Sequence, residues 1–278
     1  MVNVTAADVK RLRELTGAGM MDCKKCLEEA AGDFDKAVEL LRLKGAKDVT
    51  KRAQRVAANG LVAAEVVGTS TGVLLELNCE TDFVAKNESF QQTAAEVMAA
   101  AVRSGVSDRL ALLGAEVKPG TTVQQRIEEA SVTIKEKVEL GRFARLEGGY
   151  IASYLHKSDP SLPPTVGVLV QLDTDNPQLA KDLAQQVAAM RPAYVSEADV
   201  PAEVLEKERR IAEQITRDEG RPEKAIPRIV EGRLKSFLKD VALVEQAYVK
   251  DPKKAVKQLL TEAGANVRGF VRFKIGEA

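Results

Sequence analysis

Histidine and tryptophan are almost missing from this chain of 278 residues, which contains one histidine, His156, and no tryptophan. A serine or cysteine nucleophile activated by histidine would therefore have to use that single side chain. The residues around His156 carry no signature of such a site. We expect His156 to be a surface or hydrogen-bonding residue, and we keep it as a candidate contact with a partner.

Cysteine is also scarce, with only Cys23, Cys26 and Cys79 in the chain. This small, odd number does not make the disulfide framework of a secreted protein, so we expect a reducing, cytoplasmic location. Cys23 and Cys26 have the spacing of a redox or zinc knuckle. A structural zinc site needs four ligands, however, and only Cys79 and His156 could complete it. A metal or redox enzyme remains an alternative, but we expect no metal and no cofactor.

Net charge and long apolar runs are lacking as well. Lysine and arginine together number 41, as do aspartate and glutamate. This balance disfavours nucleic acid as the main ligand, because neutralising phosphates requires a surplus of basic side chains. No run approaches the ~18 apolar residues of a membrane span, and the N-terminus does not resemble a signal peptide. The chain also lacks the glycine-rich loops that cradle nucleotides, so we expect no direct nucleotide binding.

The residues that are present predict a folded protein of several domains, because 278 residues exceed one ordinary core. Within residues 1–45, capping signals at Thr5 and Asp33 and breaks at 16–19, Gly32 and Gly45 predict three short helices. This small bundle is similar in size and layout to ubiquitin-associated-type domains. Residues 46–58 are charged and predict a linker, which we expect to be helical.

From residue 59 onward the pattern changes to strands. Residues 61–67 and 73–78 predict a hairpin, followed by helices from about 88 and over roughly 121–139. A similar unit then recurs, with strands at 149–155 and 168–173 and an alanine-rich helix at 178–190. The sequence therefore predicts an α+β fold with two related antiparallel-sheet-plus-helix subdomains.

We place the first core subdomain at 59–140 and the second at 141–278. Residues of about 201–240 predict a helical hairpin inserted into the second subdomain, and 267–275 predict a closing strand. The charged hairpin is a candidate contact for a homodimer.

The two repeats differ after their second strands. The first continues into Thr81-Asp82-Phe83-Val84-Ala85 and the second into Thr174-Asp175-Asn176-Pro177. One interpretation is structural: Thr81 or Asp82 caps a helical turn, and Phe83 staples it to the core. The other is functional, because an exposed aromatic beside a carboxylate is typical of an interface anchor. The residues alone leave both open.

Two longer segments carry a family resemblance. Residues 16–25 (Thr-Gly-Ala-Gly-Met-Met-Asp-Cys-Lys-Lys) and 78–86 (Asn-Cys-Glu-Thr-Asp-Phe-Val-Ala-Lys) resemble the two signatures of the elongation factor Ts family. Weaker matches follow in the same order at 167–170, 230–235 and 269–273. The resemblance implies a factor that exchanges guanine nucleotide on elongation factor Tu, with a small helical domain, two related sheet subdomains and an inserted coiled coil.

The resemblance also implies roles for particular residues. Leu12, Met20 and Met21 would contact the partner's nucleotide-binding domain, and the His156 region would hold another partner domain. The segment Thr81, Asp82, Phe83 and Val84 would dislodge the partner's magnesium ion.

Two further alternatives involve no exchange activity. One is an adaptor that binds through the ubiquitin-associated-like domain. The other is a translation protein that binds RNA through basic residues near the linker, namely Lys44, Lys47, Lys51, Arg52 and Arg55. That segment has no interleaved aromatic residues for base stacking, which favours a solvated helix face.

Overall fold

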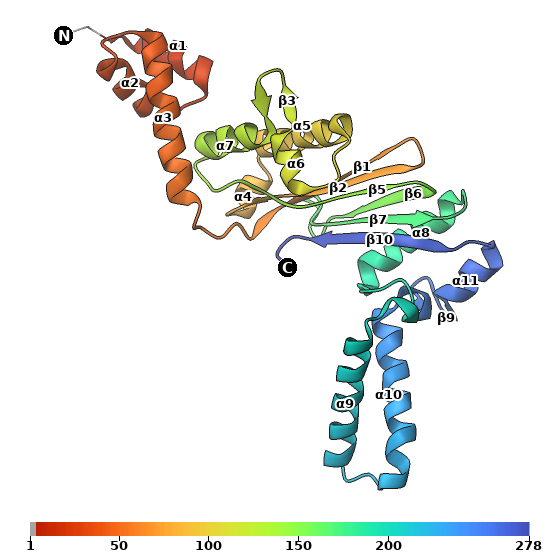
Figure 1. Cartoon of the computed structure of the whole chain (residues 1–278). Coiled ribbons are helices and arrows are strands. Elements are labelled where there is room, and N and C mark those ends of the chain that lie inside the picture. Colours follow the sequence, from red (N-terminus) through yellow and green to blue (C-terminus); the bar gives the residue numbers. More distant parts are fainter. Residues whose placement is uncertain (1–3, 278) are drawn as a thin grey trace.

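The computed structural model describes residues 4–277 and shows an α+β protein with a helical domain, two stacked sheets and a protruding helical hairpin (Figure 1). Within these residues, no helix combines the length and apolarity that crossing a membrane requires.

The helical domain consists of α1 (Ala6–Thr16), α2 (Met20–Glu29) and α3 (Phe34–Arg52). A capping box between Thr5 and Asp8 begins α1, and Gly17 ends it in the left-handed conformation. Asp33 caps α3 through the backbone N–H of Lys36. The expected three helices are confirmed, and their shared core is formed by Val9, Leu12, Cys23, Cys26, Leu27, Ala30, Ala37 and Leu41.

One expected helix end is wrong, because α3 continues through Gly45 to Arg52. Gly45 is buried against α7 (Val123–Ile134), and a Cβ atom there would lie 3.0 Å from Cγ2 of Val132. The glycine thus permits close packing of α3 on α7 and does not end the helix. Arg52 adds a second link by donating from Nη1 to the carbonyl oxygen of Ser131 at 3.2 Å.

The first sheet has the strand order β1-β2-β5 and is antiparallel throughout. Its strands are β1 (Asn59–Val67), β2 (Thr71–Cys79) and β5 (Glu139–Glu147). Helices α4 (Asp82–Ala85), α5 (Glu88–Ser104), α6 (Arg109–Gly114) and α7 cover its outer face, with a small hairpin of β3 (Glu116–Lys118) and β4 (Thr121–Thr122) (Figure 1).

The structure moves the expected boundary between the subdomains. The helix expected to reach residue 139 ends at Ile134, because Lys135 takes the left-handed conformation (φ 67°). The strand β5 then crosses residue 140 and pairs with β2. The two sheets therefore divide at the turn of Gly148 and Gly149, and β5 belongs with the first.

The second sheet repeats this topology. Its order is β10-β7-β6, formed by β6 (Tyr150–His156), β7 (Val166–Leu172) and β10 (Val267–Lys274). In both sheets the second strand of a hairpin is central, and a strand from later in the chain pairs with its free edge. Helices α8 (Pro177–Met190) and α11 (Val256–Ala263) pack on the outer face, near the short strands β8 (Ala247–Tyr248) and β9 (Asp251–Ala255). The expected internal repeat is confirmed.

The inner faces of the two sheets pack on each other through Val62, Leu74, Ile151, Leu169 and Phe273. Two glycines allow this close approach. A Cβ atom on Gly72 would lie 2.7 Å from Cγ2 of Ile151, and one on Gly167 would overlap Cγ1 of Val62. The result is a four-layer arrangement of helices, sheet, sheet and helices (Figure 1).

The helical hairpin consists of α9 (Ala202–Asp218) and α10 (Ile226–Val241) and extends away from the sheets (Figure 1). The two helices pack through Ala212, Ile226, Val230 and Leu234. Short 3-10 turns flank them at η1 (Glu197–Asp199), η2 (Glu223–Ala225) and η3 (Leu243–Glu245). The expected hairpin insertion is confirmed.

Candidate functional site

Residues 80–85, which follow β2, form a turn, the Phe83 turn. Its aromatic ring points away from the core, since Phe83 is 79% exposed. Thr81 caps α4 by accepting from the backbone N–H of Val84, as the structural interpretation expected. The residue that attaches the turn to the core is not Phe83, however. The half-buried Val84 and the buried Ala85 pack into the core of the first sheet instead. The turn therefore presents a large apolar side chain that its own fold does not use.

Asp82 precedes Phe83 in the turn and is also accessible. Its side chain is about half-exposed, and its Oδ2 lies 3.7 Å from Nζ of Lys86 in a surface ion pair. Such exposed pairs contribute little to stability. The carboxylate is therefore free to exchange this partner for another.

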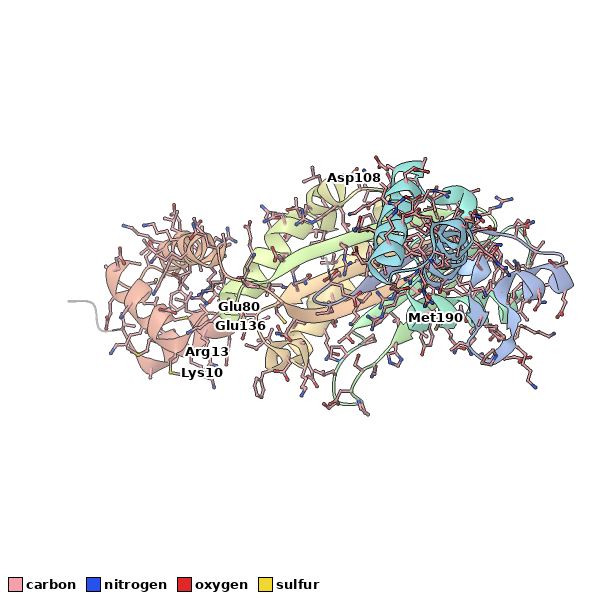
Figure 2. All side chains as sticks on the ribbon, turned by 90° about the horizontal axis from the view of Figure 1, so that it is seen from below. Lys10, Arg13, Glu80, Asp108, Glu136 and Met190 are labelled. Carbon is pink, nitrogen blue, oxygen red and sulfur yellow. The ribbon has the colours of Figure 1, made fainter. Side chains whose placement is uncertain are left out.

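Glu136 fixes the start of the Phe83 turn. Its Oε2 accepts the backbone N–H groups of Glu80 at 3.1 Å and Thr81 at 3.0 Å. Its Oε1 accepts the hydroxyl of Thr81 at 2.7 Å. Figure 2 shows Glu80 and Glu136 together at the junction of the helical domain and the sheets. Glu136 gives no local signal of this role in the sequence, because it lies 55 residues from Thr81 in the chain.

The side chain of Glu80 in turn accepts a hydrogen bond from the residue that follows Glu136. Its Oε1 accepts the backbone N–H of Lys137 at 2.6 Å and also lies 3.2 Å from Nη1 of Arg55. Burial opposes ionisation of Glu80, but the Lys137 N–H and the Arg55 guanidinium outweigh it and lower the pKa of this carboxyl. The backbone carbonyl of Glu80 accepts from Nδ2 of Asn59 at 2.8 Å. The start of the turn is thus held on several sides.

The helical domain exposes its own apolar side chains. Met20 and Met21 are 54% and 63% exposed, and Leu15 is 71% exposed. Leu12 is different: it is fully buried in the helical core, so its expected role as a partner contact is wrong. Its burial follows from the spacing with Val9, which places both on the inner face of α1. Leu15, an exposed apolar residue off that inner face, was not predicted as a site residue.

His156 lies exposed at the end of β6. Its Nδ1 is 3.2 Å from the hydroxyl of Tyr154, so the histidine has a neighbour that can orient its ring. No acid, base or nucleophile completes a catalytic set around it among the contacts in residues 4–277.

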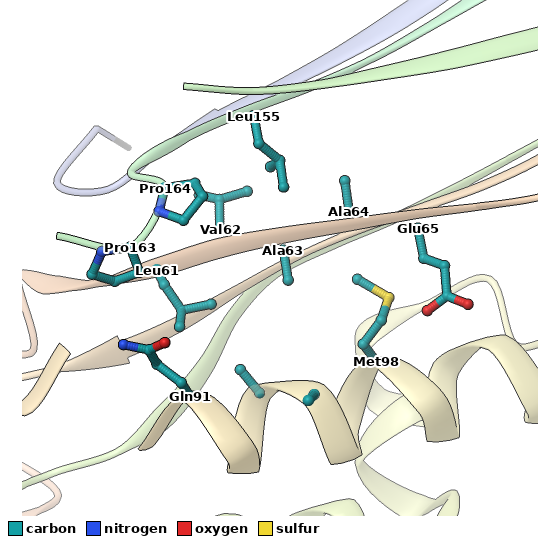
Figure 3. Close-up of a pocket in the computed structure, with 12 residues that line it drawn as sticks. Leu61, Val62, Ala63, Ala64, Glu65, Gln91, Met98, Leu155, Pro163 and Pro164 are labelled. Atoms are coloured by element: carbon teal, nitrogen blue, oxygen red, sulfur yellow. The ribbon is translucent and has the colours of Figure 1, made fainter. Parts of the chain in front are cut away.

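A groove of about 320 Å³ runs along β1 between α5 and the segment that follows β6 (Figure 3). Its lining includes Leu155, the neighbour of His156, and Gln91. The amide of Gln91 donates to the carbonyl oxygens of Ala85 and Lys86 at the end of α4. The groove therefore lies between the His156 strand and the Phe83 turn.

All three cysteines are buried and free. Burial raises the pKa of Cys23 and of Cys26, and it raises the pKa of Cys79 to about 12. A thiol held in its protonated form is a poor nucleophile and a poor metal ligand. The described part of the chain also contains no group of three or more potential metal ligands. Nothing in this geometry favours the metal or redox alternative.

These exposed side chains are of the kind found on protein-binding surfaces. A fixed turn presents an aromatic ring and a carboxylate, and further large apolar side chains are exposed on the helical domain. Large exposed aromatic and methionine side chains are typical of interface anchors.

Known proteins of one family are similar to this chain over its full length. The family model described as "Elongation factor TS" matches residues 80–277. Over the full length of both chains, the protein is 63% identical to an elongation factor Ts from Thermobifida fusca (strain YX), across 278 residues. It is 56% identical over 277 residues to an elongation factor Ts from Acidothermus cellulolyticus, with 100% of each chain covered. The elongation factor Ts of Streptomyces coelicolor shares 53% identity over 277 residues, which is 99% of this chain and 100% of that one. Since the match spans the helical domain, both sheets and the helical hairpin, this chain belongs to the elongation factor Ts family.

Proposed function

We propose that this protein is the guanine-nucleotide exchange factor of elongation factor Tu in the cytoplasm. It binds elongation factor Tu with GDP, displaces the magnesium ion of that partner, and promotes GDP release so that GTP can bind. The observation that carries the proposal is the ring of Phe83, which is 79% exposed on a turn held by Glu136. An aromatic in that position is available to enter a neighbouring protein.

The physical mechanism requires no covalent chemistry. Magnesium neutralises the phosphates of a bound nucleotide, so its displacement weakens the hold on that nucleotide. The exchange factor needs only to bind the nucleotide-free partner more tightly than the loaded one. By linkage, the factor by which it weakens nucleotide binding is also the factor by which nucleotide weakens its own binding. Incoming nucleotide therefore releases the exchange factor.

Each exposed surface has a part in this proposal. Phe83 enters the partner as a wedge, and Asp82 perturbs polar contacts near the magnesium ion. Thr81 and Val84 hold the wedge, one through hydrogen bonds and the other through the core. Met20 and Met21 dock the helical domain on the nucleotide-binding domain, and the His156 region holds a second partner domain.

The free energy available from one side chain limits the role of the wedge. Burying a phenylalanine contributes about 1.5–3 kcal/mol, which corresponds to roughly 10- to 150-fold in an equilibrium constant. If GDP release is accelerated by more than this factor, the additional binding energy must come from contacts of the helical domain and the second sheet with the partner.

Release of labelled GDP from elongation factor Tu, timed with and without this protein, tests the proposal. We expect release to accelerate with increasing concentration of the protein and then to saturate. If the protein binds elongation factor Tu tightly but does not accelerate GDP release, the adaptor alternative is favoured over an exchange factor. Steeply salt-dependent binding to RNA, with no effect on GDP release, would favour the RNA-binding alternative.

A further inference from the structure

We infer that Glu136 is a positioning residue, which holds the Phe83 turn in the orientation that nucleotide exchange requires. With Glu80 it forms a latch, defined as the reciprocal contacts between residues 80–81 and 136–137. The inference rests on the proposed function, because Glu136 acts through Phe83 and not on a nucleotide.

The latch is reciprocal at the level of the backbone. The carboxylate of Glu136 accepts the N–H groups of residues 80 and 81, while the carboxylate of Glu80 accepts the N–H of Lys137. Each segment thus supplies a charged acceptor to the amides of the other. Hydrogen bonds to an ionised acceptor are shorter and stronger than neutral ones. Two such segments restrain each other in both position and direction.

The Phe83 turn needs this external support. Helix α4 has only four residues, too few to be stable as an isolated helix. The core holds its far end through Val84 and Ala85. Glu136 holds its near end, at Glu80 and Thr81, so Phe83 lies between two fixed points. Without Glu136, the near end would lose three of its hydrogen bonds, and the exposed ring would sample more directions.

The latch also connects the turn to the helical domain. Arg55, which follows α3, pairs with the carboxylate of Glu80. Arg52, at the end of α3, bonds to the carbonyl of Ser131, whose hydroxyl donates to the carbonyl of Glu136. One short stretch, residues 131–137, therefore contacts both the helix that carries the docking domain and the turn that carries the wedge. Docking of the helical domain would fix where the ring enters the partner.

The test measures GDP release from elongation factor Tu at increasing concentrations of Glu136→Ala, Phe83→Ala and the double variant. A positioning role predicts that Glu136→Ala lowers the maximal release rate several-fold, and by no more than Phe83→Ala does. The half-saturating concentration should change little, because Met20 and Met21 remain exposed for docking. In the Phe83→Ala background, Glu136→Ala should have no further effect, since the residue acts through the ring.

Glu129→Ala is the matched control, because Glu129 is an exposed glutamate on α7 and takes part in none of the hydrogen bonds of the latch. Glu136→Gln should fall between the parent and the alanine variant, since its amide retains one acceptor oxygen. Glu136→Gln also preserves the size of the side chain, so the effect of residue 136 on GDP release can still be measured if Glu136→Ala does not fold.

Amide hydrogen exchange gives a readout that needs no partner. The N–H groups of Glu80 and Thr81 should exchange faster in Glu136→Ala than in the parent, with the central strand β2 unchanged. Unchanged protection of these amides in Glu136→Ala would overturn the inference, and so would a parent-like maximal rate of GDP release by that variant. The same holds if Glu136→Ala lowers the maximal rate by the same factor in the parent and in the Phe83→Ala background. If the parent itself does not accelerate GDP release, the proposed function fails, whereas the amide measurement still decides whether Glu136 orders the turn.

Discussion

Replacing Phe83 by alanine is the most informative single perturbation of this protein. Because 79% of the residue is exposed in the free protein, about four-fifths of its burial energy is available to a complex. Of the 1.5–3 kcal/mol for a buried phenylalanine, this share is about 1.2–2.4 kcal/mol. It corresponds to a reduction in exchange of roughly 7- to 50-fold.

The assay is release of labelled GDP from elongation factor Tu, paired with a thermal melt of each variant. The melt should not change, since the ring contributes little to the core and surface substitutions have small effects. Leu110→Ala is a matched control, because Leu110 is 75% exposed on α6 and is not part of the Phe83 turn. Parent-like GDP release by Phe83→Ala, at every concentration, would refute the wedge. A large fall in the melting temperature would refute the claim that the ring is unused by its own fold.

Four further outcomes are expected. Leu12→Ala should destabilise the helical domain by about 2–5 kcal/mol, as for a buried leucine. Met21→Ala should leave the melt unchanged and raise the half-saturating concentration for exchange about 5- to 20-fold. The three buried thiols should react with a thiol reagent only after unfolding, since burial raises the pKa of all three; rapid labelling of the native protein would contradict this. Lys274 and Arg272 lower the pKa of Glu277 from 4.5 to about 2, so the stability that this carboxylate provides is present above pH 4.5 and is lost as the pH falls toward 2. The gap in melting temperature between the parent and Glu277→Gln should therefore be constant near neutral pH and shrink below pH 4.5, and a gap that grows on acidification would contradict the assignment.

Local patterns in the sequence were sufficient for much of the fold. The cap at Thr5, the hairpin around 68–72 and the repeat at 149–190 each depend on neighbours within one or two elements, and the structure contains all three. The Phe83 turn could be singled out because only one of the two repeats carries an aromatic there. Whether that ring was buried could not be decided locally, since Val84 and Phe83 are adjacent and either could have filled the core.

The remaining features depend on contacts between distant segments. Gly45 has the sequence signal of a helix end, yet α7 packs against it and the helix continues. The strand β5 was not predicted, because its pairing partner β2 lies far earlier in the chain, and the helix before it was predicted to run to about residue 139. Glu136 is one glutamate among many, and only the fold brings it to the amides of Glu80 and Thr81. Tertiary contacts of this kind leave no local pattern in a single sequence.

The central claim is that an exposed ring on a fixed turn loosens a nucleotide by displacing the partner's magnesium ion. Its most direct test compares the acceleration of GDP release by this protein in excess magnesium and in a chelator. If the protein acts through the ion, the acceleration should be much smaller once the chelator has removed the magnesium, and Phe83→Ala should lose most of its defect there. An equal acceleration in both conditions, with an equal defect of Phe83→Ala, would contradict the account.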